Sequence, residues 1–424
     1  MRLAYKFNID FTEELKQQFV LAKNLYNQAN HHIKDVYKNE GKYCNYYDMD
    51  KYAKNLPEEY NNYRKIIKAQ SAQQILKQLD KNWKSFFKSI KDFKKYPKKY
   101  KGCPRPPKYK EELQSLIFPN QSCKIKDNIL FIGRGIKPIK LPKYIDFSIF
   151  NQVVLIPKKK HIEVIITYSR DCINSNVDMN KYMSIDLGID NLTTCISEDS
   201  VYIISGKTIK SKNQWFNKIR AKLKSQQDNV FNNNKKEGRW LNKNKLEKLS
   251  NRRDTFINDY LHKVSRFIVN SLLKQKVGNL IIGYNKDWKD SSNIGKVNNQ
   301  KFINIPYLKL IQNLEYKCEL VGIKVVKTEE SYTSKCDSLA NEKISKHKKY
   351  LGKRIFRGLF KSSNGRVINA DVNGALNIMK KVVDESYVNR IISRGFGYNP
   401  VKIRSLFNLD KGKLFQREGI KLCI

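Results

Sequence analysis

The sequence predicts a mixed α/β protein, in which a helical part and a strand-rich part precede a part where strands and helices alternate. Two stretches, 11–38 and roughly 60–95, repeat apolar residues every three or four positions, as amphipathic helices do. The stretch 115–170 consists of short apolar runs separated by turn residues, which is typical of strands. From about residue 180, strand-like and helix-like segments alternate, and this pattern favours an α/β domain.

Each of the two N-terminal helices is predicted by an apolar stripe. The stripes comprise Leu15, Phe19, Ala22, Tyr26, Ala29, Ile33 and Val36 in the first, and Ile67, Ala72, Ile75, Leu79, Trp83, Phe86 and Ile90 in the second. Two helices that pack on each other account for these stripes and leave outward lysines available for phosphates. The segment 94–110, KKYPKKYKGCPRPPKYK, is then an extended linker because its prolines forbid a regular helix. Its interleaved Lys and Tyr side chains fit a nucleic-acid contact, with a solvated linker as the alternative.

The strand-rich part predicts a small antiparallel sheet or barrel that includes the first residues of the chain. Its runs are NILFIGRGIKPIKLP, QVVLIP and HIEVIITY. The alternating part begins with three consecutive strands, KYMSIDLGI, NLTTCISE and SVYIISG. A long basic helical region, 213–275, follows. After it we expect the strand NLIIGY, a helix over 306–321, the strand IKVVKTE and a helix that starts at NADVNGALNIMKKVV.

The charge predicts a polyanionic partner. Lys and Arg number 83 against 40 Asp and Glu, a formal charge of +43, and such an excess destabilises a compact fold by self-repulsion unless a polyanion neutralises it. Nucleic acid fits, with binding that weakens as salt rises. A membrane is not expected, because no apolar stretch approaches roughly 20 residues and the start, MRLAYKFNID, lacks the apolar run of a secretion signal. Eight cysteines without a CxxC pair predict free thiols in a reducing cytoplasm.

Two carboxylates stand in positions that favour chemistry. Asp186 interrupts the apolar strand YMSIDLGI, where a carboxylate is costly unless it is paired or bound to a metal; the alternative is a strand-end residue that caps a turn. Asp371, in INADVNGALNI, opens the last helix, where an ordinary first-turn Asp is also stabilising. Together they resemble the first and last carboxylates of an RNase H-like nuclease. In that chemistry two divalent ions, about 3.5–4 Å apart, activate a water and stabilise the leaving oxygen. Mg²⁺ prefers such oxygen ligands, with Mn²⁺ as the alternative ion.

Four motifs taken in order, SIDLGIDNLTT, IGYNKDWKDSSNIGKVNNQKF, EESYTSK and INADVNGALNI, make the chain similar to TnpB. TnpB proteins are transposon-encoded, RNA-guided DNA endonucleases related to type V CRISPR effectors and to Fanzor proteins. The resemblance implies a guide RNA, double-stranded DNA and its displaced single strand as partners, in a prokaryotic cytoplasm and on the nucleoid when DNA is bound. The domains that it implies are a wedge-like β-barrel (1–10 and 107–178), an inserted helical recognition domain (11–106), a RuvC-type, RNase H-like nuclease domain (179–384) and an unassigned tail (385–424).

One departure from the family concerns the third acid. Gly283 stands where the family's usual acid follows the central strand, NLIIGY. Some members carry a glutamate before a YTS step instead, and that pattern falls on Glu330. Because neighbouring strands lie about 4.8 Å apart, Glu330 can reach past Gly283, whereas Glu329 faces the other way. The resemblance therefore implies that Asp186, Glu330 and Asp371 are the catalytic and metal-binding residues. The alternative leaves both glutamates in solvent and the enzyme inactive.

The other departure concerns the family's zinc ribbon, which corresponds to an insert at about 333–368. Cys336 is followed three residues later by Leu339, where a second cysteine is expected, and RGLFKSSNG lacks the other pair. Because one thiolate does not make a four-ligand zinc site, we expect the insert to persist without structural zinc.

These features predict an RNA-guided DNA endonuclease of transposon origin that hydrolyses phosphodiester bonds with two metal ions. Gly283 motivates one alternative, a nuclease-inactive RNA-guided DNA-binding repressor. A DNA transposase is the other alternative, because it shares RNase H chemistry but needs no guide RNA.

Overall fold

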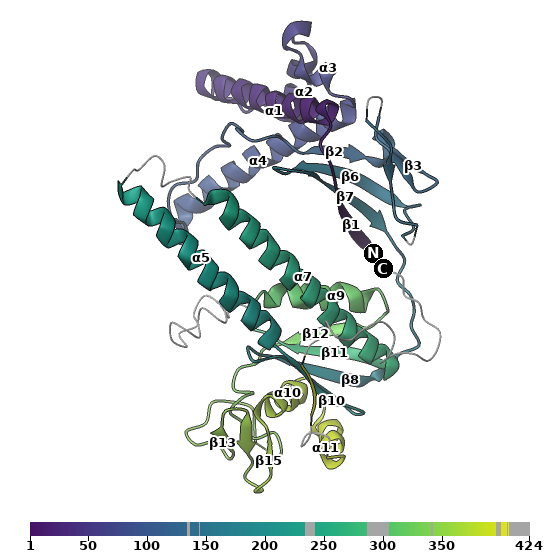
Figure 1. The fold of residues 1–424 in the computed structure, drawn as a ribbon, viewed down its shortest axis with the longest axis vertical. Helices are drawn as coiled ribbons and strands as arrows, with labels where there is room; N and C mark the ends of the chain where they lie inside the picture. The colour runs from purple at the N-terminus through teal and green to yellow at the C-terminus, as the bar shows by residue number, and fades with distance from the viewer. Residues whose placement is uncertain are drawn as a thin grey trace. The chain divides into compact units, whose positions relative to one another are not determined.

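The computed structural model describes residues 1–133, 136–143, 145–233, 242–285, 305–340, 342–395, 400–404 and 406. The chain forms two compact units, Met1–Asp171 and the described residues from Cys172 onward, whose elements are labelled in Figure 1. The division into wedge, recognition and nuclease domains stays a prediction.

The first unit begins with a strand and continues with helices. The helices are α1 (Glu13–Glu40), α2 (Tyr46–Lys54), α3 (Asn62–Lys65) and α4 (Ala69–Lys95), with single 3₁₀ turns η1 (Glu58–Tyr60), η2 (Pro97–Lys99) and η3 (Asn120–Ser122). The second predicted helix starts later than expected. The side chain of Asn61 accepts a hydrogen bond from the Arg64 amide at 3.0 Å and caps the short α3, and Ile66 then adopts extended backbone before α4.

The strands of the first unit form two separate antiparallel sheets. One has the order β1-β7-β6-β2 and the other β3-β4-β5. Their bounds are β1 (Arg2–Ile9), β2 (Leu116–Pro119), β3 (Lys124–Lys126), β4 (Ile129–Phe131), β5 (Ile139–Lys140), β6 (Phe150–Pro157) and β7 (Ile162–Ser169). Over the described residues the larger sheet runs from β1 to β2 without closing, so the predicted barrel is not confirmed.

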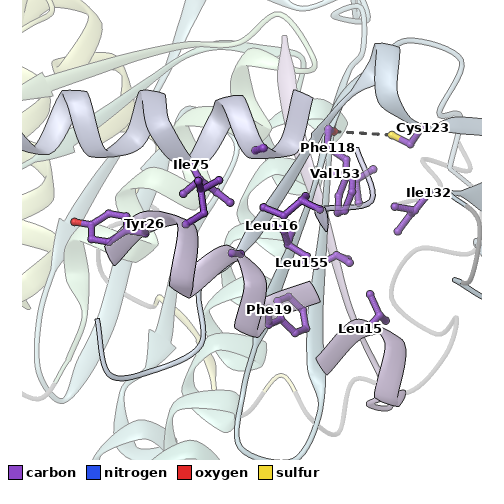
Figure 2. Close-up of a cluster of buried hydrophobic side chains, with 14 of the residues drawn as sticks. Leu15, Phe19, Tyr26, Ile75, Leu116, Phe118, Cys123, Ile132, Val153 and Leu155 are labelled. Atoms are coloured by element: carbon purple, nitrogen blue, oxygen red, sulfur yellow. Dashed lines mark hydrogen bonds between the residues drawn. The ribbon is translucent and has the colours of Figure 1, made fainter. Parts of the chain in front are cut away.

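Helices and sheet of this unit share one apolar core. Phe19 and Tyr26 of α1, Ile75 of α4 and Leu116 of β2 belong to one buried cluster (Figure 2). Each fully buried side chain of this kind contributes about 1.5–3 kcal/mol. The predicted packing of two amphipathic helices is therefore correct, and the sheet covers part of the same apolar surface.

The second unit is built on a six-stranded mixed sheet with the order β12-β11-β8-β9-β10-β16. Its strands are β8 (Asp178–Leu187), β9 (Asn191–Ser197), β10 (Val201–Ser205), β11 (Val277–Gly283), β12 (Lys324–Thr328) and β16 (Val401–Ile403). The first three are antiparallel neighbours, β11 runs parallel to β8 and to β12, and β16 runs parallel to β10. The five strands predicted before the final helix are thus confirmed.

Helices lie on both faces of this sheet. They are α5 (Lys207–Asn233), α7 (Lys243–Lys274), α9 (Tyr307–Glu319), α10 (Ala370–Lys380) and α11 (Glu385–Ser393). Figure 1 shows α7 and α9 over one face, and α10 with α11 over the other. The basic helical region predicted over 213–275 is described as two helices and starts earlier. The unassigned tail, 385–424, contributes α11 and β16, and its residues 396–399, 405 and 407–424 lie outside the described part.

A small sheet forms the insert between β12 and α10. It consists of β13 (Lys353–Phe356), β14 (Leu359–Lys361) and β15 (Val367–Asn369), all antiparallel. Among the described helices of the whole chain, none combines the length and apolarity needed to cross a membrane.

Candidate active site

The central strand of the second unit carries Asp186. This strand, β8, pairs with β11 on one side and with β9 on the other, where Asp186 lies opposite Thr194. Burial raises the pKa of the Asp186 carboxyl well above its usual value, and the negative charges of Asp371 and then Glu330 raise it further. The charge of Arg354, on β13 of the insert, lowers it. Asp186 therefore lies in a low-dielectric environment, close enough to Asp371 and Glu330 for their charges to raise its pKa.

Helix α10 brings Asp371 to the same place. Asn369 caps this helix, because its side-chain oxygen accepts hydrogen bonds from the amides of Asp371 at 2.9 Å and Val372 at 3.3 Å. Three residues after Asp371, Gly374 faces the carboxylate of Asp186. A Cβ atom on Gly374 would lie 2.9 Å from Asp186 Oδ2, so glycine permits this close approach of helix and strand.

Glu330 reaches the site from the edge of the parallel pair. β11 and β12 pair in register, with Gly283 opposite Thr328, and Glu330 follows two residues after β12 ends. The expected neighbourhood of the two strands is confirmed, although Glu330 lies in the turn beyond its strand. A Cβ atom on Gly283 would lie 3.2 Å from Glu330 Oε2 and 2.5 Å from Ile378 Cδ1. The carboxylate thus occupies space that any other residue at 283 would reduce.

One oxygen of the Glu330 carboxylate is enclosed without being satisfied, while the residue as a whole is half-buried. Its Oε2 atom is enclosed and has no hydrogen-bond partner among the described residues. Burial raises the pKa of Glu330 to about 7, and the charge of Lys381 acts in the opposite direction. Glu329 is exposed and accepts a hydrogen bond from the Ser331 hydroxyl. A buried polar atom without a partner is costly, so Glu330 is the glutamate of the pair that fits a ligand role.

The residues that connect β8 to β9 contact Asp371 and also α5, α9 and the insert. Asn191 donates from Nδ2 to Asp371 Oδ2 at 2.5 Å. Asp190 forms ion pairs with Lys210 of α5, at 2.6 Å, and with Arg357 of the insert. The hydroxyl of Tyr307, on α9, donates to the Gly188 carbonyl at 2.9 Å. Asp190 lies between the two strands and Asn191 is the first residue of β9, from where it contacts the candidate site directly.

The donor chemistry fits a hard divalent cation. Asp186, Glu330 and Asp371 offer carboxylate oxygens only, and the buried Glu330 Oε2 is not satisfied by protein donors. In the described part of the chain, no three His, Cys, Asp or Glu side chains are arranged so that they hold an ion together as they stand.

The insert has an internal connection made by carboxylates. Asp337 is fully buried and its Oδ2 accepts hydrogen bonds from the Ser362 hydroxyl at 2.7 Å and from the Ser363 amide at 2.8 Å. Glu342 accepts from the amides of Asp337 at 2.6 Å and Leu351 at 2.9 Å. These contacts join both halves of the insert in the region where the family's zinc ribbon is expected.

The thiol of the insert does not belong to a zinc ligand set. Cys336 is buried, and its Sγ lies 3.7 Å from the carbonyl oxygens of both Lys343 and Ser345. One thiolate among carbonyl oxygens does not match the Cys and His ligands of structural zinc. The residues present therefore do not fit a zinc ribbon.

Comparison with protein families gives two adjacent matches. The family model OrfB_IS605, described as a probable transposase, matches residues 163–289, which include Asp186. The Cas12f1-like TNB domain matches residues 307–378, which include Glu330 and Asp371. The chain is similar to TnpB and Cas12f proteins.

Individual relatives support this relationship over different lengths. The TnpB-like protein of Acidianus two-tailed virus is 24% identical over 96% of this chain and 89% of its own length. The TnpB-like protein of Methanocaldococcus jannaschii is 27% identical over 60% of this chain and 93% of its own. The endodeoxyribonuclease Cas12f1 of Sulfoacidibacillus thermotolerans is 27% identical over 56% of this chain, and the match spans 55% of the relative, about half its length.

Solved structures give weaker similarity. A Cas12f1–sgRNA–target DNA complex matches 89% of this chain with 16% identity and a TM-score of 0.36, and the mini-RNA-guided endonuclease Cas_phi3 matches 90% with 10% identity and a TM-score of 0.48. TM-scores this low do not bear on function.

Sequence reasoning missed several residues near the candidate site. They lie on elements other than β8: Lys210 on α5, Tyr307 on α9, and Arg354 and Arg357 in the insert. No local pattern marks them, because only the tertiary fold brings them to the β8 turn.

Proposed function

We propose that this protein is an RNA-guided DNA endonuclease of transposon origin, and that Asp186, Glu330 and Asp371 hold the divalent ions with which it hydrolyses phosphodiester bonds. The observation that carries the proposal is the buried Glu330 Oε2, which has no hydrogen-bond partner among the described residues and lies against Gly283. A buried glutamate without compensation is costly, and a cation compensates it. The mixed sheet flanked by helices supports the RNase H-like reading of the second unit.

The three carboxylates have separate supports in the chain. Asp186 is fixed by a central strand, Asp371 by the first turn of a capped helix, and Glu330 by the turn after β12. When bound, divalent ions lower the pKa of a coordinated water and offset the charge of the phosphate. The protein's own contribution is to hold the three oxygen ligands near the carboxyl ends of β8 and β12 and to enclose the Oε2 atom of Glu330.

Nearby polar residues orient the ligands and supply positive charge. Asn191 restrains one oxygen of Asp371, which leaves the other oxygen to point elsewhere. Arg354 places a positive charge near Asp186, where a substrate phosphate would add negative charge. Asn191 orients a ligand and Arg354 supplies positive charge, and neither residue transfers a proton.

The partners follow from charge and from the relatives. A charge of +43 favours a polyanion, and Cas12f1 and Cas12f2 relatives are named CRISPR-associated endodeoxyribonucleases. We therefore propose a guide RNA, double-stranded DNA and its displaced strand as partners of this chain. Base pairing with the guide would supply most of the sequence specificity.

The test is cleavage of DNA by the purified ribonucleoprotein with Glu330→Gln, and with Glu329→Gln as the matched control. The first variant is expected to lose cleavage in Mg²⁺ or Mn²⁺ while it retains bound RNA, and the control is expected to cut normally. Full activity of Glu330→Gln would overturn the site assignment. Sequencing of the co-purified RNA tests guide dependence separately.

Two other functions have specific observations in their favour. The description of the matched family as a probable transposase favours a DNA transposase, which would be active without any bound RNA. Gly283 favours a nuclease-inactive, RNA-guided DNA-binding repressor. The enclosed, unsatisfied Oε2 atom of Glu330 argues against that repressor, because a chain without metal chemistry gains nothing from this cost.

A further inference from the structure

The turn that carries Glu330 is held in a conformation that its own sequence does not favour. Tyr332 has a φ of +66°, in the left-handed region that residues with a Cβ atom rarely adopt. Within the turn, the amide and the hydroxyl of Thr333 both donate to the Glu330 carbonyl, at 3.2 and 2.8 Å. Contacts from outside the turn must therefore help to keep this conformation.

Lys381 makes such contacts on both sides of Glu330. Its Nζ donates to the Glu329 carbonyl at 2.8 Å and to the Ser331 carbonyl at 2.9 Å. The ammonium group thus bridges the carbonyls of the two residues that flank Glu330. Hydrogen bonds from a charged donor are stronger than neutral ones, so this bridge fixes the direction in which the Glu330 side chain leaves the backbone.

We propose that Lys381 is the positioning residue that makes Glu330 available to the carboxylate site. Helix α10 carries Asp371 in its first turn and ends at Lys380, and Lys381 follows as its C-cap residue. Ten residues of helix span about 15 Å, so one rigid element sets the separation between Asp371 and the turn of Glu330. The proposal rests on the proposed function only where it takes Glu330 as a metal ligand.

The other side chains of α10 that bind this region contact residues after the Glu330 position, so among them only Lys381 contacts the residues on both sides of Glu330. Asn377 donates to the carbonyls of Thr333 and Cys336, both at 2.8 Å, and Asn373 donates to the Cys336 carbonyl at 2.8 Å. These bonds fix the start of the insert, whereas Lys381 contacts the two residues beside Glu330.

The experiment compares Lys381→Met and Lys381→Arg, with Lys324→Met as the charge-matched control. Lys324 is exposed at the start of β12, the strand that leads to Glu330. Hydrogen exchange is measured on peptides that cover residues 329–336, and Mn²⁺ binding by the ribonucleoprotein is measured by electron paramagnetic resonance. Neither measurement depends on cleavage.

Lys381→Met is expected to speed exchange at residues 329–336 and to weaken Mn²⁺ binding, each by about tenfold, because it removes two charge-assisted hydrogen bonds. Lys381→Arg keeps a donor for both carbonyls and is expected to restore most of both properties, whereas Lys324→Met changes neither. DNA affinity is expected to stay unchanged in all three, and the Mg²⁺ concentration that gives half-maximal cleavage rises only in Lys381→Met.

Exchange and Mn²⁺ binding that stay the same in Lys381→Met would overturn the proposal, and so would an equal effect of Lys324→Met. Failure of the unsubstituted protein to bind Mn²⁺ or to cut DNA would refute the proposed function instead. In that case the exchange measurement still decides whether Lys381 holds the turn.

Discussion

The Glu330 carboxylate stands against Gly283, with Oε2 3.2 Å from the point where a Cβ atom of residue 283 would be. The two residues come from neighbouring parallel strands, one at the end of β11 and the other just beyond β12. The absence of a side chain at 283 is therefore a spatial requirement for the glutamate at 330.

Gly283→Ala tests this requirement. The new methyl group would lie 2.5 Å from Ile378 Cδ1 and close to Glu330 Oε2, so both side chains must move. We expect a loss of about 1–3 kcal/mol in the free energy of unfolding from overpacking. Displacement of the ligand is expected to reduce the cleavage rate by about 100-fold. Gly102→Ala is the control, because a Cβ atom there meets nothing within 4 Å. Normal cleavage by Gly283→Ala would contradict the spatial argument.

The requirement for metal should depend on pH. Burial raises the pKa of Glu330 to about 7, so below that pH the carboxyl holds a proton that a cation must displace. The sign follows: as pH falls from about 8 to about 6, the Mg²⁺ concentration for half-maximal cleavage rises, and saturating Mg²⁺ restores the rate. Cleavage is measured over a Mg²⁺ series at each pH. A half-maximal concentration that is independent of pH would show that Glu330 does not bind the ion.

The stability of the protein should depend on pH through Lys317, which is not part of the candidate site. It is buried between α9 and α7, and its Nζ donates to the His262 carbonyl and to the Ser265 hydroxyl, both at 2.8 Å. Burial lowers its pKa from 10.5 to about 7. Between these values the unfolded chain binds a proton that the folded chain does not, so the free energy of unfolding rises with pH.

Lys317→Met should remove that contribution. We expect a higher melting temperature near neutral pH and a weaker rise of stability above about pH 7, measured by thermal unfolding over a pH series. Lys324→Met serves as the exposed control. Equal slopes for the Lys317→Met variant and the unsubstituted protein would contradict the prediction.

Asp337 should stabilise the insert without zinc. Asp337→Ala leaves the buried Ser362 hydroxyl and the Ser363 amide without their acceptor, and we expect it to cost about 3 kcal/mol in the free energy of unfolding. Trypsin is expected to cut the variant faster at the lysines of residues 343–353. The exposed Asp384→Ala is the control. A chelator should not change the melting temperature of the unsubstituted protein. Stoichiometric zinc, or melting that the chelator lowers, would contradict the account.

A basic groove at the end of α4 should contribute to nucleic-acid binding. It is lined by Lys88, Ser89, Lys91, Asp92, Lys95, Lys99 and Tyr100. Asp92 pairs with Lys99 and Tyr100, at 2.7 and 2.6 Å, which leaves the helix lysines facing the groove. Replacing Lys88, Lys91 and Lys95 by Gln is expected to lower the slope of log K against log salt by about 2–3.

The charge-matched control for that groove replaces Lys158, Lys159 and Lys160, which lie between β6 and β7. Filter binding of guide RNA and of target DNA over a salt series compares the two triple variants. Equal slopes would show that net charge, and not the groove, determines the binding.

The sequence predicts the framework better than it predicts the details of the site. Asp186 and Asp371 are recognisable because each interrupts or opens a periodic apolar segment, and periodicity is a local property. Glu330 is recognisable only through its motif. The hydrogen bond from Asn191 to Asp371 and the bridge made by Lys381 join residues far apart in sequence, and local pattern contains no trace of them.

For the strand-rich part, the sequence predicts the local elements but not how they assemble. Its short runs predict strands correctly, but closure of a sheet depends on how the edges meet, and alternation of side chains does not encode that. The described strands form an open sheet with β1 and β2 at its edges, beside a separate small one.

Asn373 and Asn377 bind carbonyls where the insert begins, and β15 leads directly into α10 where it ends, so both ends of this small sheet are anchored at the same helix. The length of the insert can therefore change without shifting either end, so other polypeptide segments could be inserted there. A single residue added within α10 would instead rotate everything after it by roughly 100° and separate Lys381 from its carbonyls.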